Sequence, residues 1–216
     1  IPLSPHSSGS ETRGLRLLVN STDGNPERAA VSLYPAGATF SGDHTLRFDL
    51  WLNYNGGPGG GSGSTQFATW GLAHAGDRAV WAFNPTSDGV WFAASGEGGD
   101  SIDYRAYRQG TLLAVSDAVL AAVSGNAADP FFQNLFPAPP FETAGSPGKQ
   151  WVAVEVSYRA GVVTWRINDR LIAIRDEPNL PTGAIMLGLM DTYTSISVPP
   201  NDTFAIFDNV RVTAPD

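Results

Sequence analysis

Apolar and polar residues alternate along much of this chain, and the alternation is clearest over residues 44–54. One face of this stretch consists of Leu46, Phe48, Leu50, Leu52 and Tyr54. The other face consists of Thr45, Arg47, Asp49, Trp51 and Asn53. Because successive side chains of a β-strand point to opposite sides of the sheet, this pattern predicts a long strand with one buried face and one largely polar face.

Similar alternation predicts further strands over residues 13–20, 29–34, 66–74, 79–84, 90–95, 151–158, 162–168, 171–174, 184–190 and 203–213. Turn-forming runs separate several of them, as in NPTSDG at residues 84–89. The chain also contains 24 glycines and 16 prolines, which suits many short strands and turns. The pattern predicts one all-β domain over residues 1–216, a two-sheet antiparallel β-sandwich with residues 1–12 as a flexible end.

Residues 100–148 interrupt this rhythm and predict a long irregular insertion. Asp129 followed by Pro130 is a good helix start, so we expect one helical turn over residues 131–136. The proline-rich run at residues 136–140 predicts an extended segment, whereas residues 111–124 fit a strand or a short helix. Such an insertion often covers one end of a sandwich or lines a groove.

The charge balance excludes some classes of partner. The chain has 13 basic and 21 acidic residues, a formal net charge of -8, whereas nucleic acids are bound by basic surfaces. We therefore expect no nucleic-acid partner. No run reaches the roughly 18 apolar residues of a transmembrane helix. The chain has no cysteine, which excludes disulfides and cysteine-based zinc sites and fits a cytosolic protein or a secreted bacterial one.

Three segments resemble sequences of a known family. Residues 151–158 (WVAVEVSY) and 161–168 (GVVTWRIN) resemble the central hairpin of laminin-G-like domains. Residues 204–212 (FAIFDNVRV) are similar to the closing strand of concanavalin A-like domains in secreted bacterial proteins. The resemblance implies a jelly-roll sandwich of the concanavalin A-like lectin/glucanase type, secreted or at the cell surface. It leaves the function open, because this fold serves lectins, glycan-binding modules, glycosidases and polysaccharide lyases.

The polar face of residues 44–54 is the first candidate site. In this fold such a face can form a groove, where aromatic rings stack on sugars and Asp, Asn and Arg bind hydroxyl groups. The candidate ligand-binding residues are Arg47, Asp49, Trp51, Asn53, Trp151, Glu155 and Arg166. The alternative is a solvated face with cross-strand pairs, Arg47 with Asp49 and Glu155 with Arg166, and with its tryptophans packed under a loop. The tryptophans assigned to the core are Trp70, Trp81, Trp91 and Trp165.

The resemblance also implies a structural Ca²⁺ ion, which takes several oxygen ligands from carboxylates and backbone carbonyls. Asp208 matches the acid found in the closing strand of related domains. Its candidate partners are Asp191, Asp202 and Asp23. The alternative for Asp208 is a carboxylate that accepts hydrogen bonds from a neighbouring turn.

The sequence contains no complete catalytic motif. Laminarinase-like enzymes of this fold place their acids as E-x-D-x-x-E or E-x-D-x-E, and neither pattern occurs here. His6, His44 and His74 are scattered without metal-binding spacing. We therefore expect an extracellular, non-catalytic carbohydrate-binding or adhesion module whose partner is a polysaccharide or glycan. Two alternatives stay open: a domain that assembles with copies of itself in an extracellular filament or surface layer, and a polysaccharide-active hydrolase or lyase with a dispersed site. In a hydrolase, Asp49 and Glu155 could form the acid pair across strands.

Overall fold

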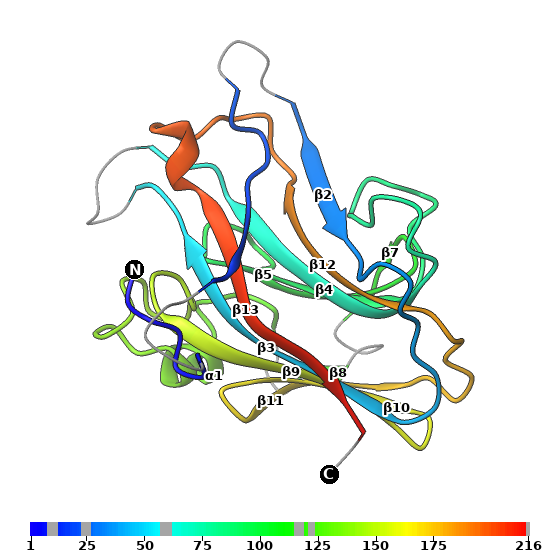
Figure 1. Cartoon of the computed structure of the whole chain (residues 1–216). Helices are drawn as coiled ribbons and strands as arrows, with labels where there is room; N and C mark the ends of the chain where they lie inside the picture. Colours follow the sequence, from blue (N-terminus) through cyan, green and yellow to red (C-terminus); the bar gives the residue numbers. More distant parts are fainter. Residues whose placement is uncertain (8–12, 23–26, 57–61, 115–118, 121–123, 215–216) are drawn as a thin grey trace.

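Two antiparallel β-sheets that pack face to face make up the fold (Figure 1). The computed structural model of the chain describes residues 1–7, 13–22, 27–56, 62–114, 119–120 and 124–214. Within these residues, sheet A has seven strands and sheet B has six. The predicted all-β sandwich is therefore confirmed.

Sheet A contains the strands with the clearest sequence pattern. In spatial order it consists of β1 (Leu15–Leu17), β13 (Phe204–Thr213), β3 (His44–Asn53), β9 (Trp151–Arg159), β10 (Val162–Ile167), β11 (Arg170–Asp176) and β8 (Val119–Leu120). The strand predicted over residues 44–54 is β3, and it lies between β13 and β9 in the sheet. The predicted hairpin is formed by β9 and β10, with Arg159 opposite Val162 beside the turn.

Sheet B packs on the other side of the core. In spatial order it consists of β2 (Ala29–Leu33), β12 (Ala184–Asp191), β4 (Gln66–His74), β5 (Val90–Ser95), β6 (Tyr104–Arg108) and β7 (Thr111–Leu112). Both β6 and β7 come from the beginning of the segment 100–148, so this segment first completes the sheet before it becomes irregular.

The rest of this segment contains the short helix α1 (Pro130–Leu135). Asp129 caps it as predicted, because its carboxylate accepts a hydrogen bond from the Phe131 amide at 2.9 Å. Residues 138–140 form a turn, so the extended segment predicted here is wrong. Among the described residues, no helix has the length and apolar character that crossing a membrane requires.

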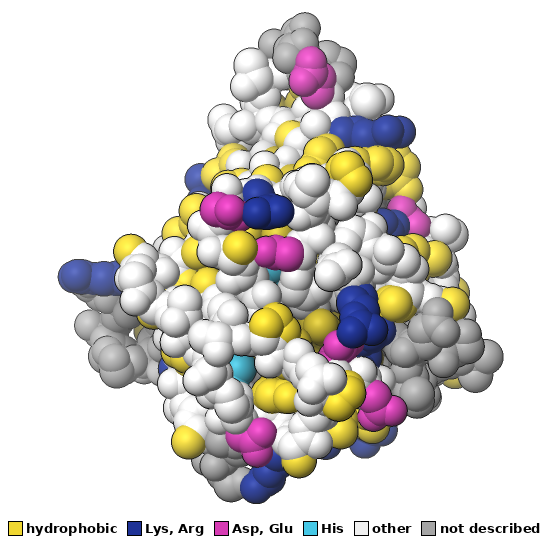
Figure 2. Space-filling view, turned by 90° about the vertical axis from the view of Figure 1, so that its right-hand side faces the viewer, with side chains coloured by type: hydrophobic (Ala, Val, Ile, Leu, Met, Phe, Trp, Pro, Cys, Tyr) yellow, Lys and Arg dark blue, Asp and Glu magenta, His cyan; other side chains and the backbone are white. Residues whose placement is uncertain are grey.

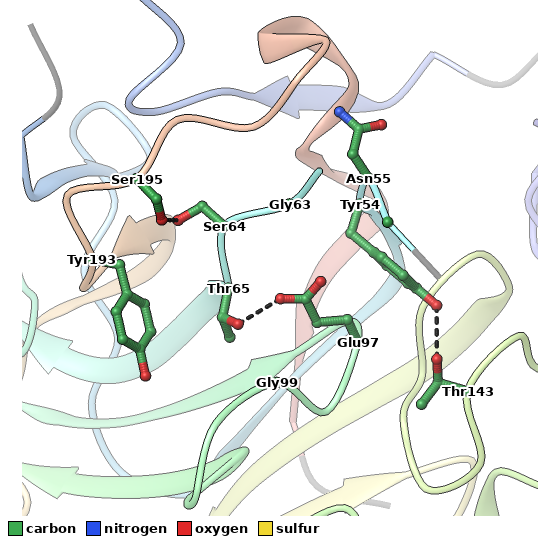
Figure 3. Close-up of a pocket in the computed structure, with 11 residues that line it drawn as sticks. Tyr54, Asn55, Gly63, Ser64, Thr65, Glu97, Gly99, Thr143, Tyr193 and Ser195 are labelled. Carbon is green, nitrogen blue, oxygen red and sulfur yellow. Dashed lines mark hydrogen bonds between the residues drawn. The ribbon is translucent and has the colours of Figure 1, made fainter. Parts of the chain in front are cut away.

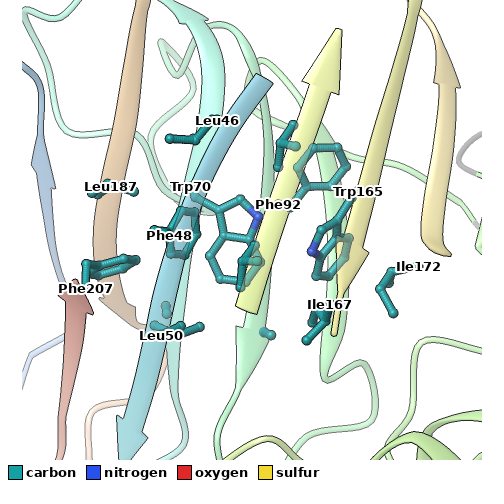
Figure 4. Packing of buried hydrophobic residues seen from close by; sticks show 14 of the residues in the cluster. Leu46, Phe48, Leu50, Trp70, Phe92, Trp165, Ile167, Ile172, Leu187 and Phe207 are labelled. Carbon is teal, nitrogen blue, oxygen red and sulfur yellow. The ribbon is translucent and has the colours of Figure 1, made fainter. Parts of the chain in front are cut away.

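The hydrophobic core lies between the two sheets. Phe48 of β3 and Val154 of β9 are each only 2% exposed, as the period-two pattern predicts. Trp165 of β10 is fully buried, and its ring centroid lies 5.4 Å from that of Trp70 and 5.1 Å from that of Phe92 (Figure 4). Strands from both sheets thus supply the rings that fill the centre of the sandwich.

The outer face of sheet B is covered as well. The loop over residues 75–89 packs onto it and buries Val80 in a second apolar cluster with Phe67 and Trp91. Trp91 also stacks on Tyr107, with ring centroids 3.7 Å apart. Much of sheet B is therefore buried on both faces.

The strand predicted over residues 79–84 is wrong, because these residues belong to the covering loop. Val80 accepts and donates hydrogen bonds with the Ser32 hydroxyl of β2, at 3.3 and 2.9 Å, instead of joining a sheet. A loop that packs on a sheet also directs alternate apolar side chains inward, so its sequence shows the same alternation of apolar and polar residues as a strand.

Candidate functional site

The outer face of sheet A brings several predicted ligand-binding residues together. Adjacent strands β3 and β9 place Arg47 opposite Glu155 and Trp51 opposite Trp151. The two indole rings meet edge to face with centroids 5.7 Å apart. Arg47 donates from Nε to the Glu155 carboxylate at 2.8 Å, so the ion pair on this face joins β3 to β9.

Residues 1–7 lie across this face. The Asp49 side chain is only 3% exposed, and it accepts hydrogen bonds from the Ser4 hydroxyl and, at 2.7 Å, from His6 Nδ1. Asn209 Nδ2 donates to the same carboxylate at 2.8 Å. Burial raises the pKa of Asp49, but these hydrogen bonds outweigh it and hold the pKa below its ordinary value.

One tryptophan of this face bonds to the N-terminal segment, and the other is buried. Trp151 donates from Nε1 to the Pro2 carbonyl at 2.9 Å, and Trp51 is only 7% exposed. These contacts place residues 1–7 on sheet A, and the flexibility expected of residues 1–12 stays a prediction. Trp51 does not offer an open ring to a ligand, because it is buried and its ring packs against that of Trp151.

The other predicted ligand-binding residues bond to nearby backbone. Arg166 donates to the Asp169 carbonyl at 3.0 Å, and Asn53 donates from Nδ2 to the Asp202 carbonyl at 2.5 Å. A hollow of about 340 Å³ remains on this face of sheet A. Its charged and titratable lining residues are His6, Arg47, Asp49, Glu155, Asp169 and Arg211.

The predicted calcium ligands are not gathered in the described part of the chain. Asp208 accepts hydrogen bonds from the Ser7 hydroxyl at 3.1 Å and from the next backbone amide at 2.8 Å. Asp202 ends the 3-10 helix η2 (Pro200–Asp202), and Asp23 lies outside the described residues. Among the residues that are described, no group of three metal-ligating side chains occurs. Calcium binding stays a prediction.

Asp191, at the end of β12, joins loops that are far apart in the sequence. Its carboxylate accepts hydrogen bonds from Asn20 Nδ2 at 3.0 Å and from the Ser64 hydroxyl at 2.9 Å. Gln66 Nε2 adds a longer one at 3.3 Å, and the Tyr193 amide donates at 2.8 Å. Asp191 therefore fixes the start of the loop that follows β12 and contains Tyr193.

Two hollows meet at Tyr193. The larger one, of about 450 Å³, is lined on its polar side by Tyr54, Asn55, Ser64, Thr65, Glu97 and Ser195 (Figure 3). The smaller one, of about 360 Å³, is lined by Arg28, Phe83, Asp100, Arg105, Thr192 and Thr194. Tyr193 lines both, so they share a wall. We call them the Glu97 hollow and the Arg28 hollow.

Tyr193 is 41% exposed, yet hydrogen bonds fix both its backbone and its ring. Its hydroxyl donates to Asp100 at 2.5 Å, and this acceptor raises the pKa of Tyr193 to about 12. Burial raises the pKa of Asp100, but the bonds from Tyr193 and the Ile102 amide, with Arg105 at 2.8 Å, hold it below its ordinary value. At neutral pH the tyrosine therefore stays protonated and the carboxylate ionised, which keeps the ring in place.

Glu97 lines the Glu97 hollow, and its pKa is shifted upward, whereas that of Asp100 is shifted downward. Burial raises its pKa, and the charges of Asp103 and Asp191 raise it further, against a lowering by the hydrogen bond that the Thr65 hydroxyl donates at 2.5 Å. The two hollows thus contain carboxyl groups, Glu97 and Asp100, whose pKa values are shifted apart. General acid–base chemistry uses such pairs.

Figure 2 views the molecule from the side on which β2 and β7 lie in Figure 1. Acidic and basic side chains are scattered there among apolar and uncharged ones, with no large area of one sign. A charged ligand on this side would therefore depend on individual side chains at short range, rather than on a broad surface potential.

The sequence did not reveal the residues of the two hollows. Tyr193, Phe83 and Arg28 lie in loops or at the edge of a strand, where no periodic pattern marks them. The one signal near Tyr193 is a run of hydroxyl residues after the apolar strand β12, which is typical of a polar loop. Such a run does not indicate which distant residues the loop will meet.

Comparisons with known proteins concern the architecture. No protein-family model matches the chain, and no curated protein matches it by sequence. Among solved structures, the Emp47p carbohydrate recognition domain is 10% identical with a TM-score of 0.53, over 95% of this chain and 87% of that one. The metal-free Emp46p carbohydrate recognition domain is 12% identical with a TM-score of 0.53, over 94% and 85%. The carbohydrate-binding module CBM66 from Bacillus subtilis is 12% identical with a TM-score of 0.49, over 99% and 100%.

At identities this low, a likeness concerns the fold alone. The Emp47p and Emp46p domains match this chain along most of the length of both partners. The two antiparallel sheets of this chain, A and B, pack around a shared core and so form a β-sandwich of the same kind. This chain has the concanavalin A-like lectin/glucanase fold.

Proposed function

We propose that this protein binds carbohydrate, and that the Glu97 and Arg28 hollows on either side of Tyr193 form the binding site. The observation that supports this most directly is the Tyr193 ring, which is partly exposed and held between two polar hollows. Aromatic rings stack on the apolar faces of sugars, while hydroxyl, amide and carboxylate groups bind sugar hydroxyls. Both kinds of group share one continuous surface here.

The lining of the Glu97 hollow favours a polar ligand over an apolar one. Ser64, Thr65 and Ser195, which carry hydroxyl groups, line it together with Asn55. Ser195 donates to Ser64 at 3.0 Å, so the hydroxyl groups form a connected set. A sugar offers hydroxyl groups that both donate and accept, which matches such a set.

The fold supports the same proposal. The similar Emp47p and Emp46p domains are named carbohydrate recognition domains. The proposal includes a location outside the cell or at its surface, and a role in binding rather than catalysis. It moves the site from the outer face of sheet A, which residues 1–7 cover, to the hollows around Tyr193.

Tyr193→Ala is expected to weaken carbohydrate binding about five- to thirtyfold, because a stacked aromatic ring contributes on the order of 1–2 kcal/mol. Glycan-array screening, followed by isothermal titration calorimetry with the best sugar, measures the effect. Tyr193→Phe keeps the ring but removes the hydroxyl that Asp100 holds, so it is expected to lose less affinity than Tyr193→Ala, at most about 0.5–1.5 kcal/mol.

Two further variants make this result specific. Leu112→Ala removes another exposed apolar side chain, on β7, and is expected to leave binding unchanged. Trp51→Ala tests the outer face of sheet A. Sugar binding that survives Tyr193→Ala but disappears in a folded Trp51→Ala variant would move the site back to that face.

A polysaccharide-active enzyme is the second candidate, and Glu97 is the observation that favours it. A carboxyl group with a raised pKa at the wall of a hollow can protonate a leaving group. If this candidate is right, reducing-sugar or unsaturated-sugar release is expected from the wild-type chain and a loss of about a hundredfold or more from Glu97→Gln. Release that is unchanged in Glu97→Gln would exclude Glu97 from that role.

A further inference from the structure

The Arg28 hollow differs in charge from the rest of the chain. Arg28 and Arg105 bring two positive charges to its lining and Asp100 brings one negative charge, whereas the whole chain has a net charge of -8. A locally positive hollow on an acidic protein needs an explanation in terms of either structure or ligand.

Contacts within the fold account for the positive charge of Arg105. Its guanidinium lies 2.8 Å from Asp100, donates from Nε to the Ile102 carbonyl at 2.7 Å and sits 4.1 Å from the centroid of the Phe67 ring. Its side chain is 11% exposed. Arg105 therefore neutralises Asp100, which in turn holds the Tyr193 hydroxyl, and its positive charge is used within the fold.

Arg28 has no comparable partner. Its guanidinium lies over the ring of Phe83, 4.4 Å from the centroid, and within the described part of the chain it forms no ion pair. Arg28 is itself exposed, so this contact does not remove the side chain from solvent. The stacking holds the planar group beside the hollow while its N–H groups stay available for a ligand.

We propose that the Arg28 hollow selects carbohydrates that carry an acidic group, a carboxylate or a sulfate, and that Arg28 binds this group. This inference rests on the proposed function, because it assumes that a sugar contacts Tyr193. Guanidinium groups bind carboxylate and sulfate oxygens in a forked geometry. The hydroxyl groups of Thr192 and Thr194 line the same hollow and can donate to the remaining oxygens.

Matched pairs of sugars provide the test. Oligogalacturonate is compared with its neutral methyl ester, and a sulfated galactan oligosaccharide with its desulfated form, by titration calorimetry at low and at moderate salt. The wild-type chain is expected to bind an acidic member about tenfold more tightly than its neutral counterpart. This preference is expected to shrink as salt is added, because the charges are exposed.

Arg28→Gln is expected to weaken binding of the acidic members about tenfold, so that the ratio of acidic to neutral affinity falls to about one. Arg16→Gln is the matched control, because the Arg16 guanidinium also lies over an aromatic ring, 4.2 Å from the centroid of Phe204, but outside both hollows. Arg16→Gln is expected to keep the preference. Equal melting temperatures of the two variants would show that both are folded.

The outcomes separate this inference from the proposed function. If neutral sugars bind through Tyr193 and acidic ones bind no better, selection of acidic sugars is wrong and carbohydrate binding stands. If the preference persists in Arg28→Gln, another group provides it and the role of Arg28 is wrong. If the wild-type chain binds no sugar, both proposals fail. A preference in only one of the two pairs identifies the acidic group.

Discussion

Replacing Trp165 with alanine is expected to lower the free energy of unfolding by about 3–5 kcal/mol, the range typical of buried aromatic truncations. The side chain is fully buried at the centre of the sandwich, where its ring meets those of Trp70, Phe92 and Tyr104. Because strands of both sheets contribute these rings, neither sheet can move inward to fill the cavity without disturbing its own hydrogen bonds. Urea denaturation followed by circular dichroism measures the loss.

Trp165→Phe is the control for this substitution. It keeps an aromatic ring and removes the indole N–H, which is buried and has no hydrogen-bond partner among the described residues. It is expected to cost less than half as much as Trp165→Ala, because removing an unpaired polar group offsets part of the lost packing. A loss below about 1 kcal/mol for Trp165→Ala would contradict its place in the core.

Asp49→Ala is expected to lower the free energy of unfolding by about 2–3 kcal/mol and to release residues 1–7 from sheet A. The buried carboxylate is the shared acceptor for Ser4, His6 and Asn209, and hydrogen bonds to a charged group contribute about 1.5–3 kcal/mol. Hydrogen exchange measured by mass spectrometry reports the release, because the His6 amide also donates to Asp49, at 3.2 Å. Faster exchange is expected in the N-terminal peptide and unchanged exchange in β10.

The effect of Asp49 is expected to depend on pH. Its pKa in the folded chain lies below that in the unfolded chain, about 3.9, so its contribution is complete above that value. As the pH falls through the folded pKa the contribution is lost, and wild type and Asp49→Ala become more alike. Asp77→Ala serves as the control, because Asp77 is exposed and its ion pair within the described part of the chain is with its neighbour Arg78, at 2.6 Å. A stability difference that stays constant down to pH 2 would contradict the assignment to Asp49.

The sequence predicted the strands whose burial is one-sided. Leu46, Phe48 and Leu50 alternate with polar residues because β3 has one face in the core, and the same holds for β9. The prediction failed at residues 79–84, where a loop buries Val80 and Trp91 lies beneath it. Alternation indicates which side chains are buried. It does not indicate whether the backbone bonds to a neighbouring strand or, as at Val80, to a single hydroxyl group.

The candidate site was harder to predict than the fold. The register between neighbouring strands follows from their local alternation pattern, so the pairing of Trp51 with Trp151 can be predicted from the sequence. The contact of residues 1–7 with Trp151 cannot, because irregular segments have no period that fixes their position. For the same reason, the sequence does not predict the hydrogen bond between Tyr193 and Asp100, which lie 93 positions apart.

The two hydrogen bonds that hold Tyr193 also have a thermodynamic consequence. A side chain that a ligand immobilises loses about 0.5–1.5 kcal/mol of conformational freedom on association. For Tyr193 that freedom is given up during folding, since the ring is anchored through Asp100 and the backbone through Asp191 before any ligand arrives. A ligand that stacks on this ring therefore meets a preorganised surface, and the entropy of its binding will reflect the release of water more than the ordering of the protein.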